Sequence, residues 1–349
     1  MAISIREVAA QAGVSRTTVS QVLNNNAQAR ITDETRERVR RVAQETGYRP
    51  NLLARSLGRR RTDTLGLMIS GLRNPFFVSL LEAAEAVALE AGYQVLADTA
   101  PASALGSYSE HGRLRGWPVD GVLMWGFPHQ VASNYLGPQS QDIPVVYLGY
   151  TRRDGTCAVA FDLHGGGRQA AEHLVTQGYR RITYLYPYRA GLQEPANPSA
   201  EPADLRYQAY REVCRDAGLE PRTILMPREE ETRAAGLEAG LRLAALAPSE
   251  RPDAVLCFND VIAVGVYHGL RRAGLSVPGD MAVIGFDGIE EGRFLDKPLT
   301  TVVSPADVLC REAFGLLAPL LRGEQAGEAR PAEARQVLVP TALFRGETA

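Results

Sequence analysis

Residues 4–23 read SIREVAAQAGVSRTTVSQVL, and this stretch decides the fold of the amino-terminal end of the chain. Apolar residues recur at helical spacing on both sides of Gly13, and Ser4 and Ser15 each precede one of these segments. Serine is a preferred N-cap, and Glu7, three residues after Ser4, completes a capping box. The pattern predicts two short helices about a tight turn, which is a helix-turn-helix layout whose second helix can enter a major groove.

Charge separates this interpretation from that of an ordinary helical hairpin. Residues 1–61 contain twelve arginines and five acidic residues, a net charge of +7, whereas the whole chain carries −2. A basic head on an acidic remainder is typical of a nucleic-acid-binding module joined to another domain. We therefore interpret the head as a DNA-binding unit.

The segments that follow extend the pattern. Thr32 can cap a third helix that ends at Gly47, and residues 52–57, LLARSL, are too few to form a stable helix alone. Here the chain resembles the lactose/galactose repressor family of bacterial transcriptional regulators. The matching residues are Val8-Ala9, Ala12-Gly13-Val14-Ser15, Thr18-Val19-Ser20, Val22-Leu23-Asn24, Thr35-Arg36-Glu37-Arg38-Val39, Gly47-Tyr48-Arg49-Pro50-Asn51 and Ala54-Arg55-Ser56-Leu57.

The resemblance implies which residues meet DNA. In that family the segment after the head is a hinge helix that folds on operator DNA and inserts a leucine into the minor groove, and the matching residue is Leu57. The chemistry of the second helix suits Gln21 to adenine and Arg16 to guanine. A surface helix whose leucines merely pack is the alternative for residues 52–57. The expected DNA-binding residues are Ser15, Arg16, Thr17, Ser20, Gln21, Asn24, Asn51, Ala54 and Leu57.

Composition and absent motifs exclude several classes of protein and of site for this chain. No apolar run approaches a membrane span and no signal segment opens the sequence, so we expect a cytoplasmic protein with no membrane partner. The four cysteines are far apart and form no CxxC pair, so neither a zinc site nor a disulfide framework is expected. The sequence also lacks a P-loop, an HExxH motif and a GxSxG elbow. We therefore expect no cofactor, no metal and no enzymatic activity.

Strands and helices alternate after residue 63. Residues 64–69 read as a buried strand, 77–91 as an amphipathic helix and 93–97 as the next strand, and the alternation continues to about residue 285. This spacing predicts parallel sheets covered by helices. About twelve elements exceed a single sheet, so the expected fold class is α/β, with an all-α helix-turn-helix head and a body of two parallel-sheet subdomains about a cleft.

The resemblance covers this body too. The matching blocks are Asn74-Pro75-Phe76-Phe77, Val119-Asp120-Gly121-Val122, Asp162-Leu163-His164-Gly165-Gly166, Gly178-Tyr179-Arg180-Arg181-Ile182, Phe258-Asn259-Asp260, Ile284-Gly285-Phe286-Asp287 and Pro298-Leu299-Thr300-Thr301-Val302. They imply a body like the periplasmic sugar-binding proteins, with crossovers near residues 162, 290 and 320. The expected domains are a head at 1–49, a hinge and linker at 50–61, one subdomain at 62–162 with 291–320, and a second at 163–290 with 321–349.

The resemblance also implies an effector site in the cleft. It places Arg206, Asn259 and Asp287 at positions that the family uses for its ligand. An arginine fork, an amide and a carboxylate at strand ends can together bind vicinal hydroxyls or a ring amide. The alternatives are a helix cap for Asn259 or Asp260 and a turn for Asp287.

Aromatic residues complete the expected site. Phe76 and Phe77 match an aromatic pair on the cleft wall, and Trp125 follows a strand nearby, although core residues would look identical in sequence. The chain departs from the family at Gly149, where many relatives have an aspartate. The effector contacts on that wall are therefore expected to differ.

Together these observations predict a homodimeric regulator, most simply a repressor, that binds a palindromic operator under control of a small molecule. The expected effector is a sugar or a sugar derivative, since sugars dominate the family. The alternatives are a free-standing solute receptor, a nucleotide-dependent enzyme, and a purine- or nucleoside-responsive regulator of the same family. The basic head argues against the first, and the absence of a GxGxxG motif after a strand argues against the second.

Overall fold

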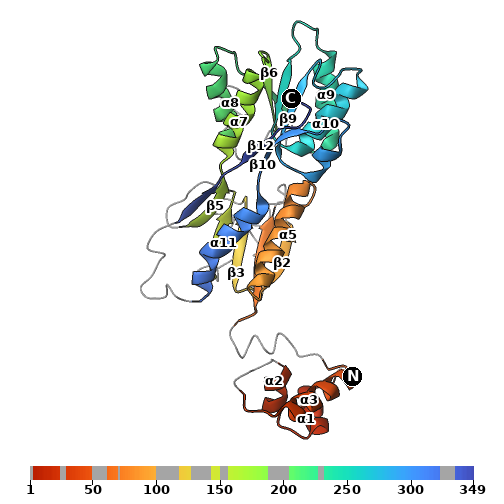
Figure 1. The fold of residues 1–349 in the computed structure, drawn as a ribbon, viewed down its shortest axis with the longest axis vertical. Helices are drawn as coiled ribbons and strands as arrows, with labels where there is room; N and C mark the ends of the chain where they lie inside the picture. The colour runs from red at the N-terminus through yellow and green to blue at the C-terminus, as the bar shows by residue number, and fades with distance from the viewer. Residues whose placement is uncertain are drawn as a thin grey trace, which may run out of the picture. The chain divides into compact units, whose positions relative to one another are not determined.

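The computed structural model describes most of the chain in ten stretches and divides it into two compact units, Met1–Asp63 and Thr64–Ala349. We call the first unit the head and the second the body, and Figure 1 shows the elements of each. The described residues are 3–23, 29–48, 61–69, 71–99, 118–126, 143–149, 156–187, 204–226, 232–322 and 335–349.

In the described residues of the head, the helices are α1 (Ile5–Ala12), α2 (Arg16–Leu23) and α3 (Asp33–Glu45). The capping box predicted at Ser4 and Glu7 is confirmed, with the Ser4 backbone N–H donating to the Glu7 carboxylate at 2.7 Å. Apolar side chains from all three helices form one small core. Its buried members are Val8, Ala9, Ala12, Val19, Val22, Val39, Val42 and Ala43.

The predicted turn of the head is also present. Gly13 ends α1 in the left-handed conformation at φ 64°, which a residue without Cβ adopts at little cost. Arg38 of α3 donates from Nε to the carbonyl of Ala12 at 3.0 Å, so the third helix satisfies an acceptor at the end of the first. Thr32 caps α3 as predicted, and Gly47 follows it at φ 65°.

The described residues of the body form two six-stranded sheets. The first, sheet A, is parallel throughout in the order β11-β5-β4-β3-β1-β2. Helices α5 (Pro75–Glu90) and α11 (Ala306–Leu321) pack against each other and against this sheet. Its strands are β1 (Thr64–Ile69), β2 (Gln94–Thr99), β3 (Gly121–Trp125), β4 (Val145–Leu148), β5 (Cys157–Phe161) and β11 (Gln336–Val339).

Sheet B has the order β12-β10-β9-β8-β6-β7 and is parallel except for β12, which runs antiparallel to β10. Figure 1 shows α7 and α8 on one face of this sheet and α9 and α10 on the other. Its strands are β6 (Ile182–Pro187), β7 (Arg222–Met226), β8 (Ala254–Cys257), β9 (Ala282–Asp287), β10 (Thr300–Val303) and β12 (Ala342–Phe344). The helices are α7 (Leu163–Thr176), α8 (Leu205–Asp216), α9 (Arg233–Ala245) and α10 (Asp260–Arg272), with a short 3₁₀ turn, η5, at Glu290–Phe294.

Between the described strands the chain passes from one sheet to the other at three places, two of which differ from the prediction. The first crossover, near residue 162, follows β5 as expected, but the second follows β10 at residues 304–305 and the third joins β11 to β12 at 340–341. The expected crossovers near 290 and 320 are therefore wrong. Strand β10 remains in sheet B because it pairs with β9, and β11 returns to sheet A beside β5.

In both sheets, the crossovers lie at the edge formed by the carboxyl ends of the parallel strands. Strand β5 ends at the first crossover and β10 ends at the second, so the carboxyl ends of the parallel strands of both sheets meet there. Ligands of open parallel sheets bind beyond this edge. Among the described residues, no helix combines the length and the apolar composition that crossing a membrane requires.

Candidate functional site

The start of α2 carries the first of the side chains that the sequence predicts to contact DNA. Ser15 precedes the helix, and its hydroxyl oxygen accepts a hydrogen bond from the backbone N–H of Thr18 at 3.0 Å. Ser15 is therefore the N-cap, as the sequence predicted. Its hydroxyl also lies 2.9 Å from that of Thr18, so the Ser15 side chain first serves to fix the helix.

The outward face of α2 collects the expected base-reading residues. Arg16 and Thr17 in the first turn are exposed, and Ser20 and Gln21, one turn later, are half-buried. Residues four apart lie on the same side of a helix, so Arg16 sits above Ser20 and Thr17 above Gln21. Val22 points the opposite way and is fully buried. The helix therefore presents one polar face and packs with the other.

Four of the predicted DNA-binding residues lie outside the described part of the chain. They are Asn24, Asn51, Ala54 and Leu57. The minor-groove leucine and the hinge helix therefore remain predictions from the sequence.

In the body, Asn74 and Asp287 connect the facing edges of the two sheets. Asn74 follows β1 and caps α5, with its Oδ1 accepting from the Phe76 backbone N–H at 3.0 Å. Its Nδ2 donates to Oδ2 of Asp287, the last residue of β9, at 2.8 Å. Asp287 adopts φ 113°, which is unfavourable for a residue with a side chain and is a form of strain common at functional sites.

Asn74 was not among the predicted site residues. An asparagine before proline at a helix start is recognisable from sequence as an N-cap. Its second bond, from the amide nitrogen to Asp287, joins residues that are 213 positions apart, and only the fold brings them together.

Arg206 is held rigidly at the start of α8. Its Nε donates to the Asp204 carboxylate at 3.0 Å, and its Nη1 donates to the Phe258 carbonyl at 2.9 Å. The guanidinium carbon lies 3.8 Å from the centroid of the Phe258 ring and 5.1 Å from that of Phe286. The side chains of Arg206 and Asp204 are only 11% and 6% exposed, so this is a buried ion pair beneath aromatic rings.

The surroundings keep Arg206 charged. Burial alone would lower the pKa of its guanidinium, but the neighbouring Asp204, Tyr184 and Asp287 outweigh burial and raise it. Asp204 also accepts a hydrogen bond of 2.7 Å from the Tyr184 hydroxyl. The bonds described above use Nε and Nη1, and Nη2 donates no hydrogen bond to another described residue.

The glycine run at residues 165–167 has a packing role. A Cβ on Gly167 would lie 2.7 Å from the backbone of Arg206, and one on Gly166 would lie 2.5 Å from the Thr341 hydroxyl. These glycines let α7 approach α8 and the third crossover closely. Close packing at the start of α7 therefore accounts for these glycines.

Asn259 is a helix cap, which was one of the two interpretations that the sequence left open, and its role in ligand binding stays a prediction. It caps α10, with Oδ1 accepting from the Ile262 backbone N–H at 3.0 Å, and the residue is 3% exposed. Its Nδ2 donates to no group within the described ranges. A buried amide with donors to spare at the carboxyl edge of sheet B is suited to bind a ligand acceptor.

Asp260, the next residue, fixes the end of β9. Its carboxylate accepts from the backbone N–H groups of Gly288 and Ile289 at 2.7 and 2.8 Å and from the Thr301 hydroxyl at 2.6 Å. Burial and the nearby charge of Asp287 raise its pKa well above the ordinary value. Asp260 thereby ties β9 to β10 and holds Asp287 in place, a positioning role that sequence reasoning did not identify.

An aromatic cluster lies at the carboxyl edge of sheet A, and we call it the aromatic wall. It consists of Phe76, Phe77, Trp125 and Phe161, whose ring centroids lie 5.3 to 6.1 Å apart in the contacting pairs. Phe76 is 5% exposed and belongs mainly to the core, whereas Phe77 and Trp125 are half-buried. The expected trio Phe76, Phe77 and Trp125 is therefore brought together, with Phe161 behind it.

The departure from the family at Gly149 is explained by this wall. Gly149 has φ +77°, and a Cβ placed on it would lie 2.9 Å from two ring atoms of Trp125. The indole thus occupies the space that a side chain at position 149 would need. On this wall an aromatic surface stands where many relatives have an aspartate, and the departure at Gly149 leads us to expect different contacts here.

The cleft edges offer binding chemistry rather than metal chemistry. Across the described stretches, no three His, Cys, Asp or Glu residues gather closely enough to hold a metal ion. Sheet A contributes an aromatic surface, and sheet B contributes Arg206, Asn259 and Asp287. Such a site can stack one face of a small ring and hydrogen-bond its substituents.

Comparisons with known proteins agree along the whole chain. Residues 4–51 match the family model of bacterial regulatory proteins of the lacI family, and residues 171–349 match that of the periplasmic binding protein-like domain. The HTH-type transcriptional regulator CelR of Thermobifida fusca is 33% identical over 92% of this chain and 92% of its own length.

Solved structures give the same result. A complex of the transcriptional regulator CelR with cellobiose is 29% identical, covers 99% of this chain and 100% of its own, and superposes with a TM-score of 0.64. The lac repressor dimer bound to operator and the anti-inducer ONPF superposes with a TM-score of 0.79 and covers 100% of this chain and 99% of its own. Because the identity is only 22%, this second comparison shows similarity of fold alone.

Proposed function

The chain belongs to the lacI family of bacterial regulatory proteins, and we propose that it is a homodimeric, effector-controlled repressor acting on a palindromic operator in the cytoplasm. Its relatives are transcriptional regulators rather than enzymes. The observation that carries the proposal is the capped α2 with its polar outward face, on a head of net charge +7. Two heads on a two-fold axis would each read one half-site.

The proposed base contacts come from α2 and from the segment after the head. Arg16 would donate to guanine O6 and N7, and Gln21 would pair with adenine N6 and N7. Leu57, with Ala54 beside it, would insert into the minor groove at the centre of the operator. Ser15, Thr17, Ser20, Asn24 and Asn51 would contact the same DNA.

The proposed effector is a sugar or a sugar derivative bound between the facing sheet edges. Phe77 and Trp125 would stack on a ring, while Arg206, Asn259 and Asp287 would bind its hydroxyls. The CelR structure in complex with cellobiose supports this class of ligand. Because Asn74 already bonds Asp287 across the sheets, a ligand that competes for Asp287 would favour a different approach of the two edges.

Operator binding in the presence of candidate ligands tests the proposal. Binding-site selection with the full chain is expected to recover a palindrome. Fluorescence anisotropy on that palindrome is then repeated with cellobiose, glucose, ribose and adenine. We expect two chains per operator and a change in operator affinity with at least one sugar. Selection of no palindrome, or one chain per site, would refute the DNA-binding part. An effect of adenine alone would favour the nucleobase-responsive alternative.

A further inference from the structure

A second polar surface lies beside the proposed effector site. A cavity of about 330 Å³ opens between α5 and the two segments that follow β9 and β10. Its volume falls within the range of small-molecule sites. Phe76 and Asp287 line it as well, so it continues the cleft described above rather than standing apart from it.

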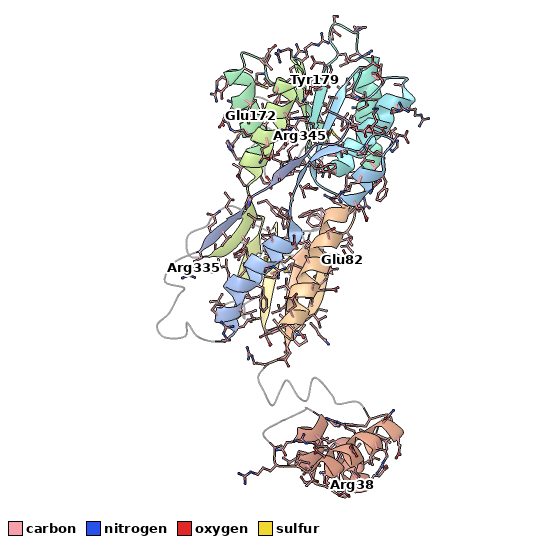
Figure 2. The ribbon with its side chains drawn as sticks, viewed as in Figure 1. Arg38, Glu82, Glu172, Tyr179, Arg335 and Arg345 are labelled. Atoms are coloured by element: carbon pink, nitrogen blue, oxygen red, sulfur yellow. The ribbon has the colours of Figure 1, made fainter. Side chains whose placement is uncertain are left out.

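The lining of this cavity is acidic. Glu82 of α5, Asp287 at the end of β9 and Asp307 at the start of α11 contribute carboxylates, and Ser79 and Ser304 contribute hydroxyls. No Arg, Lys or His is among the lining residues of the described chain. Glu82, labelled in Figure 2 on α5, and Asp307 are both exposed and form the rim. The cavity therefore favours a positive group that enters from solvent.

Ser304 marks the inner end of the cavity. The residue is only 6% exposed, and its hydroxyl has no hydrogen-bond partner in the described part of the chain. Unlike the fully buried unpaired atoms Nε2 of His173 and Nε of Arg251, the Ser304 oxygen keeps some accessible surface, and the residue lines the cavity. The Ser304 hydroxyl is thus an unpaired polar group, on a nearly buried residue, that a ligand in the cavity can reach.

The floor of the cavity is fixed before any ligand arrives. The Ser304 backbone N–H donates to the Asp287 carbonyl at 3.1 Å, which holds the segments after β9 and β10 side by side. Asp260 binds the backbone of Gly288 and Ile289, and Asn74 binds the Asp287 side chain. A ligand here would contact α5 of one subdomain and the crossover segments that lead to the other. Its binding would therefore act on the connection between the sheets.

We propose that this cavity binds a protonated amino group, so that the effector is a polyhydroxylated amine such as an amino sugar. This rests on the proposed function, since the amine would extend from a ring held in the cleft. The carboxylates at the rim would attract the ammonium, and Asp287 and the Ser304 hydroxyl would accept its hydrogen bonds. A metal ion is a poorer fit, because no three ligating side chains converge in the described residues.

Matched pairs of probes test the proposal on the full chain. Calorimetry in an amine-free phosphate buffer at pH 7 would compare D-glucosamine with D-glucose, D-galactosamine with D-galactose, and Tris with pentaerythritol. In each pair the first compound carries an amino group where the second carries a neutral group, a hydroxyl in the sugars and a hydroxymethyl in pentaerythritol. We expect the amine of at least one pair to bind about five- to tenfold more tightly than its partner.

Charge-neutralising variants locate the effect. The double variant Glu82→Gln/Asp307→Asn keeps side-chain volume and is expected to reduce the amine preference to about twofold or less, whereas Ser304→Ala should weaken the amine and leave its neutral partner nearly unchanged. The matched control is Glu85→Gln/Glu312→Gln, which removes the same charge from exposed positions of α5 and α11 outside the cavity.

Each outcome decides the proposal. If no pair shows an amine preference, or if the control abolishes the preference as fully as the cavity variant does, the amine site is wrong. Those results would leave operator binding and a response to neutral sugars intact, so the proposed function can stand without the amine site. Amine binding without any operator-binding activity would instead refute the proposed function alone.

Discussion

The head and the body place their functional side chains in opposite ways. In the head, Arg16 and Thr17 are exposed on a helix that needs only a cap and a small core. In the body, Arg206 and Asn259 are nearly buried, and each is bonded to the structure that positions it. Head substitutions should therefore alter DNA binding with little change in stability. Substitutions in the body site should change folding and ligand response together.

The largest expected difference between the head and the body is in how salt concentration affects operator binding and unfolding. Binding of operator neutralises phosphates and releases counterions, so its affinity should fall roughly 10³-fold between about 50 and 200 mM salt for a dimer with two basic heads. The free energy of unfolding of the body should change little, because buried pairs such as Arg206–Asp204 are poorly screened. Anisotropy on the selected operator and urea unfolding at both salt concentrations measure this. An operator affinity that stays flat would contradict the phosphate contacts.

Arg206→Ala should give the largest effect within the body. It leaves the Asp204 carboxylate and the Phe258 carbonyl without their buried partner, and breaking a buried pair costs about 3–5 kcal/mol. Urea unfolding should show this loss together with loss of the effector response. Arg168→Ala is the control, since Arg168 pairs with Glu212 at the surface and should cost at most about 1 kcal/mol. Equal losses in both variants would show that the Arg206 pair is not structural.

Gly149→Asp introduces the aspartate that many relatives have at this position and should destabilise the body. A residue with a side chain held at φ +77° lowers the free energy of unfolding by about 1–3 kcal/mol. The clash of the new side chain with Trp125 lowers it by about another 1–3 kcal/mol. Gly92→Asp is the matched control, because Gly92 has φ +80° but nothing within 4 Å of its Cβ position. The difference between the two variants should vanish in a Trp125→Ala background. A difference that persists there would mean that the indole is not what fills the space.

The sequence was sufficient where a role depends on nearby residues. The capping box at Ser4, the cap at Ser15 and the turn at Gly13 are all local, and each is present as predicted. The run of apolar residues at 64–69 likewise forms a buried strand, because a central parallel strand is covered on both faces.

The sequence was insufficient where a role depends on pairing between distant segments. Strand β10 stays with β9, and Thr301 donates to Asp260, 41 residues earlier, so the second crossover falls after residue 303 rather than near 290. Asn74 reaches Asp287 and Trp125 fills the space at Gly149 for the same reason. No local pattern encodes these contacts, although the types of residue involved were recognisable.

Gln21→Arg should have the smallest effect on the protein and the most specific effect on DNA. Gln21 is half-buried on the outward face of α2, so the substitution should change the free energy of unfolding by no more than about 0.5 kcal/mol. Glutamine pairs bidentately with adenine N6 and N7, whereas arginine pairs with guanine O6 and N7, and such a pair is worth about 1–3 kcal/mol of discrimination.

Binding-site selection should therefore recover guanine in place of adenine at one position of each half-site, with the guanine opposite Arg16 retained. Gln11→Arg is the charge-matched control. Gln11 is exposed on α1, so its replacement by arginine adds the same charge to the head without changing α2. The control should tighten binding to all sequences alike, since added charge acts on phosphates and carries no base information. If Gln21→Arg selects the wild-type half-site, or if Gln11→Arg shifts the base as well, Gln21 does not read that base. The head would then dock on DNA in a different orientation, with α2 no longer presenting this face to the base edges.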